Sequence, residues 1–381
     1  MTTAPGFLES VISLRIRPDV RAMHAYVVQE SKGLVKLDAM ENPYALPAEL
    51  QAELGQRLGR AALNRYPDSR VNDLRSALAR YADMPAGFDI MLGNGSDELI
   101  TLLSVACSSI AVAEHESPAV ALAPVPGFVM YALSAQWQGL RFVGVPLDAN
   151  FDLDVPAMSD AIATHRPALV YLAYPNNPTA NLWDAQAMQA VVQACAATKS
   201  LVVIDEAYQP FSSSSYLDVI RSDPEKHAHV LLMRTLSKFG LAGVRLGYML
   251  GQASLIAELD KVRPPYNVSV LNYECALFAL EHANVFAAQA AEIRSQRSRL
   301  LQALAQFSGI DKVWPSDANM ILVRMAGESG RAQQIFEKLR AHGVLVKNVS
   351  GMHPLLSNCL RVTVGSAPEN DQLLNALKEV L

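Results

Sequence analysis

From residue 89 onwards, short apolar runs alternate with stretches that have helical spacing. The runs read DIMLG, AVALAPV, RFVGVPL, ALVYLAYP, LVVIDEAY, HVLLMRTLS and RLGYMLG, and several are bounded by Gly, Pro or Asn. Segments between them, such as DAQAMQAVVQACAAT, repeat apolar residues at helical intervals. Strands that alternate with helices predict a largely parallel sheet covered on both faces, and ligands of such sheets bind beyond the carboxyl ends of the strands.

The pattern changes after Tyr266, and this change divides the chain. Helical stretches cover roughly residues 269 to 306, and strand-like and helical segments then alternate up to the C-terminus. We expect three parts: residues 1–45 as an N-terminal arm that also supplies part of the small domain, 46–270 as the large domain, and 271–381 as a smaller α+β domain.

The composition excludes several classes of protein. The 381 residues are 51% hydrophobic and 18% charged, and the formal net charge is −5. Because no basic tract is present, we expect a globular protein that binds no nucleic acid. The N-terminus lacks a signal-peptide core, and no apolar run approaches the roughly 20 residues needed to cross a bilayer. We therefore expect a cytoplasmic protein with no membrane partner.

The spacing of cysteines and histidines predicts no metal site. The four cysteines form no CxxC pair, so we expect reduced, mostly buried thiols at Cys107, Cys195, Cys275 and Cys359. His227 and His229 have no third ligand nearby in the sequence, which favours surface or turn positions over metal binding.

The stretch TLSKFGLAGVRLGY, residues 235–248, carries the most suggestive chemistry. Lys238 follows an apolar run and the hydroxyls of Thr235 and Ser237, and Arg245 comes after it. Burying an unpaired ammonium is costly. A lysine in this place therefore suits condensation with an aldehyde while its neighbours hold a phosphate. The alternative is a strand end with one solvated lysine.

Two further motifs follow apolar runs and suit an anion or a planar ring. GNGSDE, residues 93–98, opens a helix whose free N–H groups favour an anion. The alternative is an ordinary turn in which Ser96 or Asp97 caps the helix. In PGFVMY, residues 126–131, Phe128 can cover the face of a planar ring or belong to the core.

Two other strand ends offer hydrogen-bonding groups for such a ring. In YPNNPTA, residues 174–180, prolines fix a rigid turn and Asn177 can donate to a ring oxygen, although a turn alone would also explain the motif. Asp205 ends an apolar strand in IDEAYQPF, where a protonated pyridine nitrogen would stabilise it. The alternative for Asp205 is a helix cap or a structural ion pair. Tyr208 can offer its hydroxyl to the same ring oxygen.

In their order along the chain, the five motifs resemble those of the fold-type I aminotransferases, which use pyridoxal 5′-phosphate. The resemblance spans most of the chain, from LDAMENPY to LRVTVG. It implies an α/β large domain with a mostly parallel seven-stranded sheet covered by helices, plus a smaller α+β C-terminal domain. Lys238 would bond covalently to the cofactor aldehyde and later carry the proton between Cα and C4′, with Asp205 and Tyr208 also catalytic. Cofactor contacts are implied for Tyr66, Gly95, Ser96, Asp97, Phe128, Asn177, Asp205, Tyr208, Thr235, Ser237, Lys238 and Arg245.

Within this group the chain is similar to the histidinol-phosphate aminotransferases, on phrases that include LNRYPD, VRPPYNVS and GVLVKN. These enzymes of histidine biosynthesis transfer the amino group of L-histidinol phosphate to 2-oxoglutarate, giving imidazole-acetol phosphate and L-glutamate. The resemblance implies substrate contacts for Tyr26, Asn177, Tyr266, Lys347 and Arg361. Arg361 would hold both the substrate phosphate and the glutamate carboxylate. It also implies a homodimer with shared active sites, in which Tyr66 reaches the cofactor phosphate of the neighbouring subunit.

Two departures from the family pattern bear on the substrate. Many relatives have arginine and aspartate where this chain has Lys347 and Asn348, and many have tyrosine at Phe128. Lysine keeps a charge but lacks a bidentate fork, so phosphate affinity or selectivity is open. An aromatic amino-acid aminotransferase and a phospho-amino-acid decarboxylase are alternatives on the same scaffold. The intact Lys238 and Asp205 disfavour a non-enzymatic regulator, and the lack of GxGxxG disfavours an NAD-dependent enzyme.

Overall fold

The computed structural model describes residues 5–23, 25, 29–67, 70–108 and 118–381. The chain separates into two compact units, Met1–Gly33 and Leu34–Leu381. The first unit contains the helices α1 (Pro5–Arg15) and α2 (Pro18–Arg21). The domain limits expected near residues 45 and 270 stay predictions.

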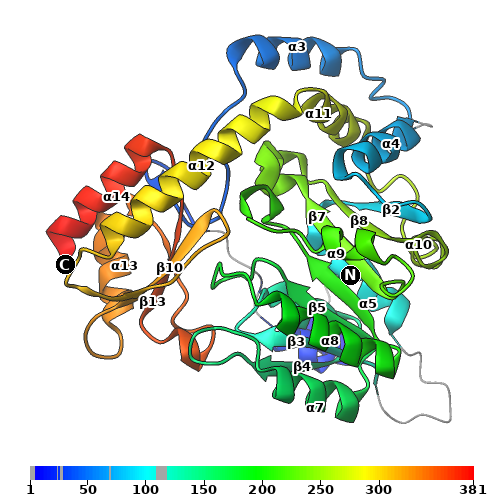
Figure 1. Cartoon of the computed structure of the whole chain (residues 1–381), viewed down its shortest axis with the longest axis horizontal. Coiled ribbons are helices and arrows are strands. Elements are labelled where there is room, and N and C mark those ends of the chain that lie inside the picture. The colour runs from blue at the N-terminus through cyan, green and yellow to red at the C-terminus, as the bar shows by residue number, and fades with distance from the viewer. Residues whose placement is uncertain (1–4, 24, 26–28, 68–69, 109–117) are drawn as a thin grey trace. The chain divides into compact units, whose positions relative to one another are not determined.

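A seven-stranded sheet is the centre of the second unit (Figure 1). Its strands lie in the order β2 (Phe88–Gly93), β8 (Gly247–Gln252), β7 (Val230–Thr235), β6 (Leu201–Asp205), β5 (Leu169–Ala173), β3 (Val120–Val125) and β4 (Arg141–Pro146). Only β8 pairs antiparallel with its neighbours; the other pairs are parallel. The mostly parallel seven-stranded sheet expected from the sequence is confirmed.

The strands are apolar on both faces because helices cover both. Along β5, Val170 and Leu172 join one buried cluster while Tyr171 and Ala173 join the other, as the two-residue period of a strand requires. One face packs against α5 (Gly95–Cys107), α6 (Val129–Trp137) and α10 (Ala253–Asp260). The other face packs against α4 (Arg70–Ala82), α7 (Val155–His165), α8 (Ala185–Thr198), α9 (Leu217–Ser222) and α11 (Val270–Glu281), and α3 (Ala48–Gly59) lies against α11.

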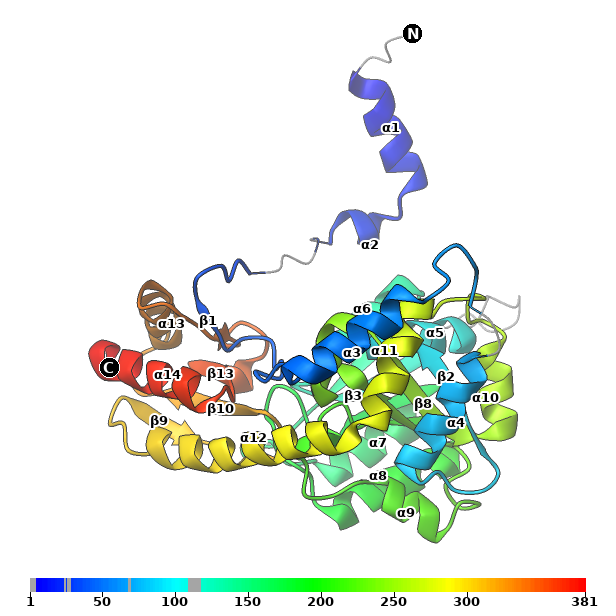
Figure 2. The same ribbon diagram turned by 90° about the horizontal axis from the view of Figure 1, so that it is seen from above.

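A smaller antiparallel sheet has its own apolar core. Its strand order is β12 (Lys347–Asn348), β13 (Cys359–Thr363), β10 (Met320–Met325) and β9 (Ile310–Val313). The helices α13 (Arg331–Ala341) and α14 (Ala367–Val380) contribute to this core, and β1 (Val35–Lys36) pairs parallel with β11 (Val344–Leu345) beside it. The long helix α12 (Ala283–Leu304) runs from α11 to β9 and β10 (Figure 2).

Two arginines of α12 bind backbone carbonyl oxygens of distant segments. The Arg294 guanidinium donates to the carbonyl oxygen of Pro210, and Arg297 donates to those of Phe211 and Ala318. Arg299 alone of the three is exposed, with an ion pair to Asp371 at 2.6 Å. The side chains of Arg294 and Arg297 therefore connect α12 to the segments around residues 210 and 318.

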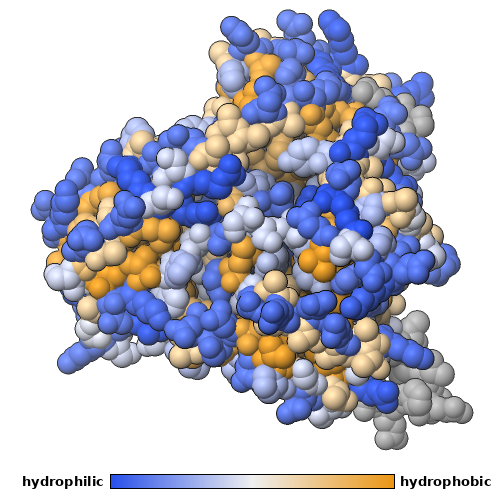
Figure 3. All heavy atoms as spheres, viewed as in Figure 1, coloured by the Kyte–Doolittle hydropathy of each residue, from blue (hydrophilic) through white to orange (hydrophobic). Residues whose placement is uncertain are grey.

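On the face seen in Figure 3, hydrophobic side chains form separate patches among hydrophilic ones. Within the described ranges, no helix has both the length and the apolar character needed to cross a membrane. The four cysteines are unpaired; Cys195 and Cys359 are buried, and Cys107 and Cys275 are partly buried. His227 is buried in a turn with Nδ1 2.8 Å from the Asp223 carbonyl oxygen, and the described residues contain no group of three metal-ligating side chains.

Candidate active site

A pocket of about 120 Å³ lies beyond the carboxyl ends of the parallel strands. Asp205 ends β6, Thr235 ends β7, and Phe128 follows β3 just before α6. The structure thus gathers side chains that are more than a hundred residues apart. The pocket is lined by Met40, Ser96, Asp97, Phe128, Tyr131, Ala173, Pro175, Asn177, Asp205, Ala207, Tyr208, Thr235, Ser237, Lys238 and Arg245.

Asp205 is a buried carboxylate whose hydrogen bonds come from neutral donors. The residue is only 4% exposed. The hydroxyl of Tyr131 donates to Oδ2 at 2.7 Å, and the backbone N–H of Ala207 donates to Oδ1 at 3.0 Å. Burial raises its pKa to about 6, the nearby carboxylates of Asp97 and Glu206 add to the rise, and the two hydrogen bonds oppose it. Among the described residues Asp205 forms no ion pair, so a cationic ligand would stabilise it.

Lys238 lies in the π-type turn Ser237–Leu241 that follows β7. Its ammonium donates a hydrogen bond of 3.0 Å to the carbonyl oxygen of Ala39 and lies 6.0 Å from the centre of the Tyr208 ring. Burial lowers its pKa to about 8, and the positive charges of Arg361 and Arg245 act in the same direction. The alternative of a simply solvated lysine is therefore wrong. A larger share of this amine is neutral near pH 8 than in a solvated lysine, and a neutral amine can attack a carbonyl.

Arg245 and the first turn of α5 form an anion-binding corner. The Arg245 guanidinium donates to the Ser237 hydroxyl at 3.2 Å and to the Asp97 carboxylate at 3.3 Å. The helix begins at Gly95 with Asn94 at the N-cap position, so neither Ser96 nor Asp97 caps it, contrary to the alternative considered from the sequence. The free N–H groups of this turn and the neighbouring cation favour a bound phosphate.

Two glycines make this corner possible. A Cβ at Gly95, whose φ is +76°, would lie 2.7 Å from Arg245 Nη2. A Cβ on Gly247 would lie 2.6 Å from the carbonyl carbon of Gly95. Glycine at both positions lets the Arg245 side chain, the start of β8 and the start of α5 approach one another.

Arg361 connects the small sheet to the turn after β5. Its guanidinium donates to Asn177 Oδ1 at 2.7 Å and to the carbonyl oxygen of Asp38 at 2.8 Å. Lys347 is its partner in the register of β12 and β13, so the two side chains share one face of the small sheet. Lys347 does not line the pocket of Lys238.

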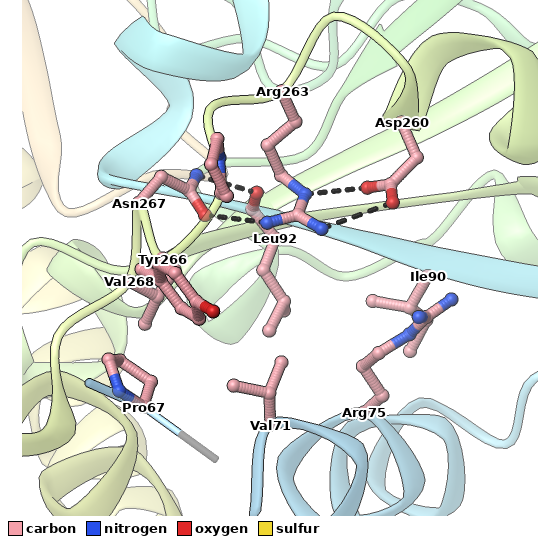
Figure 4. Close-up of a pocket in the computed structure, with 11 residues that line it drawn as sticks. Pro67, Val71, Arg75, Ile90, Leu92, Asp260, Arg263, Tyr266, Asn267 and Val268 are labelled. Atoms are coloured by element: carbon pink, nitrogen blue, oxygen red, sulfur yellow. Dashed lines mark hydrogen bonds and ion pairs between the residues drawn. The ribbon is translucent and has the colours of Figure 1, made fainter. Parts of the chain in front are cut away.

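Tyr66 and Tyr266 lie apart from Lys238 and stack on each other. Their ring centres are 4.7 Å apart with an interplanar angle of 19°, and the residues are 78% and 56% exposed. Tyr266 borders a second pocket of about 290 Å³, beside the Arg263 guanidinium, which is held by Asp260 and Asn267 (Figure 4). The lining of the Lys238 pocket includes neither tyrosine. Tyr26, also expected at the substrate, lies outside the described residues.

Sequence reasoning did not single out Tyr131 or Met40. Tyr131 stands three residues after Phe128 at the start of a helix, and this spacing could have indicated a shared face. Met40 reaches the pocket in a segment that is bound to β13, since its backbone N–H donates to the Thr363 hydroxyl across 323 positions of sequence. No local signal predicts that contact.

The residues present fit pyridoxal 5′-phosphate. Lys238 supplies an amine of lowered pKa for its aldehyde. Asp205 has no cationic partner among the described residues, and a protonated ring nitrogen would provide one. The Arg245 corner offers donors for its phosphate, and Phe128 lines the same pocket with an aromatic ring. The arrangement suits condensation chemistry on a small anionic aldehyde.

Comparisons with known proteins agree with this geometry. The family model described as aminotransferase class I and II matches residues 32–377. A histidinol-phosphate aminotransferase of Paracidovorax citrulli is 63% identical, with 96% of this chain and 97% of that protein covered, and one of Acidovorax ebreus is 61% identical over the whole of both chains. The crystal structure of histidinol-phosphate aminotransferase from Sinorhizobium meliloti in complex with pyridoxal-5′-phosphate has a TM-score of 0.81 at 26% identity, covering 96% of this chain and 97% of that one. Because the match to the family model extends over nearly the whole sequence, this chain belongs to the class I and II aminotransferase family.

Proposed function

We propose that this protein transfers the amino group of L-histidinol phosphate to 2-oxoglutarate, giving imidazole-acetol phosphate and L-glutamate, as a pyridoxal phosphate-dependent enzyme of histidine biosynthesis. The observation that carries the chemistry is one pocket that combines a lysine amine of lowered pKa, an anion-binding corner and a buried carboxylate with no cationic partner in the described part of the chain. The names of relatives above 60% identity over nearly the full chain support the substrate.

The cofactor would be held by groups from several strand ends. Thr235, Ser237, Arg245 and the first turn of α5 at Gly95, Ser96 and Asp97 would bind the phosphate. Asp205 would face the ring nitrogen, Asn177 and Tyr208 the ring oxygen, and Phe128 one face of the ring. When bound, pyridoxal phosphate supplies an aldehyde that takes up the amino group and a pyridinium ring that withdraws electrons from the bond being broken.

Lys238 and Asp205 would do the proton and nucleophile chemistry. The lowered pKa of Lys238 increases the fraction of its amine that is neutral and can attack an aldehyde. The same Nζ would remove the proton from the substrate Cα. Asp205, once ionised, favours a protonated ring nitrogen because opposite charges stabilise each other in a buried site.

Arg361 would bind the anionic end of each substrate. Its planar guanidinium suits either the phosphate of histidinol phosphate or a carboxylate of glutamate. Lys347, its cross-strand partner, would add a second positive charge without a fork. Asn177 already accepts a hydrogen bond from Arg361 and would fix the direction of the guanidinium.

The active unit would be a cytoplasmic homodimer. Tyr66 and Tyr266 are exposed and stacked, and neither lines the Lys238 pocket of its own chain. In a dimer, Tyr66 would reach the cofactor phosphate of the second copy and Tyr266 its substrate. Exposed aromatic side chains of this kind are enriched in protein interfaces. Tyr26 would also contact substrate.

The test is the visible absorption of the purified protein reconstituted with pyridoxal phosphate. Wild-type protein should show the band of the lysine-bound cofactor, and L-histidinol phosphate should bleach it, whereas Lys238→Ala should not form the band. Bleaching by phenylalanine or tyrosine alone would favour the aromatic aminotransferase. Release of CO2 from a phosphorylated amino acid would favour the decarboxylase. The absence of a band in the wild type would overturn the proposal.

A further inference from the structure

Tyr131, in the first turn of α6, contacts Asp205 and Phe128 of the pocket and Tyr171 of β5. Tyr131 is 2% exposed, and its hydroxyl donates to Oδ2 of Asp205 at 2.7 Å. Its ring stacks on Tyr171 with centres 4.4 Å apart and an interplanar angle of 7°. It also makes a T-shaped contact with the Phe128 ring, with centres 5.6 Å apart and an interplanar angle of 85°. The packing of the Tyr131 ring against these two side chains therefore fixes the position of its hydroxyl.

We propose that Tyr131 is a positioning residue that keeps Asp205 ionised and turned toward the ring nitrogen of the cofactor. This inference rests on the function proposed above. A hydrogen bond to the ionised form of a carboxylate favours that form, and a fixed donor on Oδ2 limits rotation of the carboxylate. Oδ1 is fixed in turn by the backbone N–H of Ala207, so both oxygens have a set direction before the cofactor arrives.

The surroundings of Asp205 explain why this hydrogen bond matters. Burial and the carboxylates of Asp97 on α5 and Glu206 on the same segment all disfavour ionisation of Asp205. Of the groups that favour ionisation, the Tyr131 hydroxyl has the largest effect and the Ala207 N–H follows. The other titratable groups around Asp205 are Tyr171 on β5, Tyr208 after β6, and the cations Lys238 and Arg245 across the pocket.

The substitution Tyr131→Phe removes the hydroxyl and keeps the ring, so the packing against Tyr171 and Phe128 is retained. Tyr171→Phe is the matched control, because it removes a buried hydroxyl from the other ring of the stack and that hydroxyl makes no hydrogen bond to Asp205. Loss of a hydrogen bond to a charged group should raise the pKa of Asp205 by about one to two pH units, given the usual strength of such a bond.

The first readout is the affinity of cofactor-free protein for pyridoxal phosphate, measured by absorption titration between pH 6 and pH 8.5. If binding requires ionised Asp205, Tyr131→Phe should bind about five- to fiftyfold more weakly than wild type at pH 6 and within about twofold at pH 8.5. Tyr171→Phe should show a ratio to wild type that does not change with pH. A simple packing defect would not be rescued by raising the pH.

A second readout needs no cofactor. The urea midpoint of the cofactor-free protein should fall with rising pH until the folded-state pKa of Asp205 is reached. The pH at which this fall ends should be about one to two units higher in Tyr131→Phe than in wild type, and unchanged in Tyr171→Phe. Suppose that wild type binds the cofactor. If the affinity ratio of Tyr131→Phe to wild type then does not change with pH, or if the urea midpoints of the two proteins respond to pH alike, the role of Tyr131 alone is overturned. A wild type that does not bind pyridoxal phosphate would overturn the proposed function and this assignment together.

Discussion

Replacing Asp205 by asparagine should make the cofactor-free protein more stable and abolish the turnover of the enzyme reconstituted with cofactor. The folded-state pKa of Asp205 is raised from its ordinary value of 3.8 to about 6, mainly by burial. Between these pH values the folded protein keeps a proton that the unfolded chain has released. Stability due to this group therefore falls as the pH rises through that window, and the full loss, about 3 kcal/mol, is present above pH 6.

Asparagine avoids this loss because it does not ionise. It can still accept the Ala207 N–H, but it must rearrange its contact with Tyr131, at a cost of about 1 kcal/mol. We therefore expect the variant to exceed wild type by about 2 kcal/mol at pH 8. Turnover should be lost, since a neutral amide has no negative charge to stabilise a protonated ring nitrogen.

The assay is urea unfolding of the cofactor-free proteins from pH 4 to pH 8.5. The free energy of unfolding of wild type relative to the variant should fall across pH 4 to 6 and then stay level. Two stability curves that run parallel over the whole range would refute the reasoning, because they would mean that Asp205 titrates alike in the folded and unfolded states.

Three further expectations concern other parts of the pocket. Lys238→Ala should abolish transamination without unfolding the protein, as checked by turnover and circular dichroism; substantial turnover by a well-folded variant would refute the role of Lys238. Gly247→Ala should lower stability by about 1–3 kcal/mol and weaken cofactor binding, because its Cβ would meet the backbone of Gly95, whereas Gly243→Ala, with open space around it, is the control and should change neither unfolding nor binding. Lys347→Arg should lower the KM for L-histidinol phosphate about three- to tenfold by adding a bidentate fork, and an unchanged or higher KM in steady-state kinetics would contradict a phosphate contact at this position.

The order of strands and helices along the chain was predictable because it depends on local periodicity. The apolar runs from DIMLG to RLGYMLG correspond to the strands of the large sheet, and the polar residues that follow the parallel strands lie at their carboxyl edge. Asp205, Thr235 and Phe128 share a pocket for this reason. Parallel strands bring their ends together whatever the sequence separation, so a motif after each strand is enough to indicate a common site.

The contacts that tune the site were decided by the tertiary structure. Nothing in the sequence indicates that Tyr131 donates to Asp205, or that Arg361 reaches Asn177 across 184 positions of the chain. The carbonyl of Ala39 accepts from Lys238 only because the segment before α3 is held against β13. These interactions join segments with no shared periodicity, and their energy depends on burial and on the direction of each group after packing. The sequence by itself therefore determined the fold, the family and the residues expected to carry the chemistry, whereas the packed structure decided the partners, protonation and orientation of these residues.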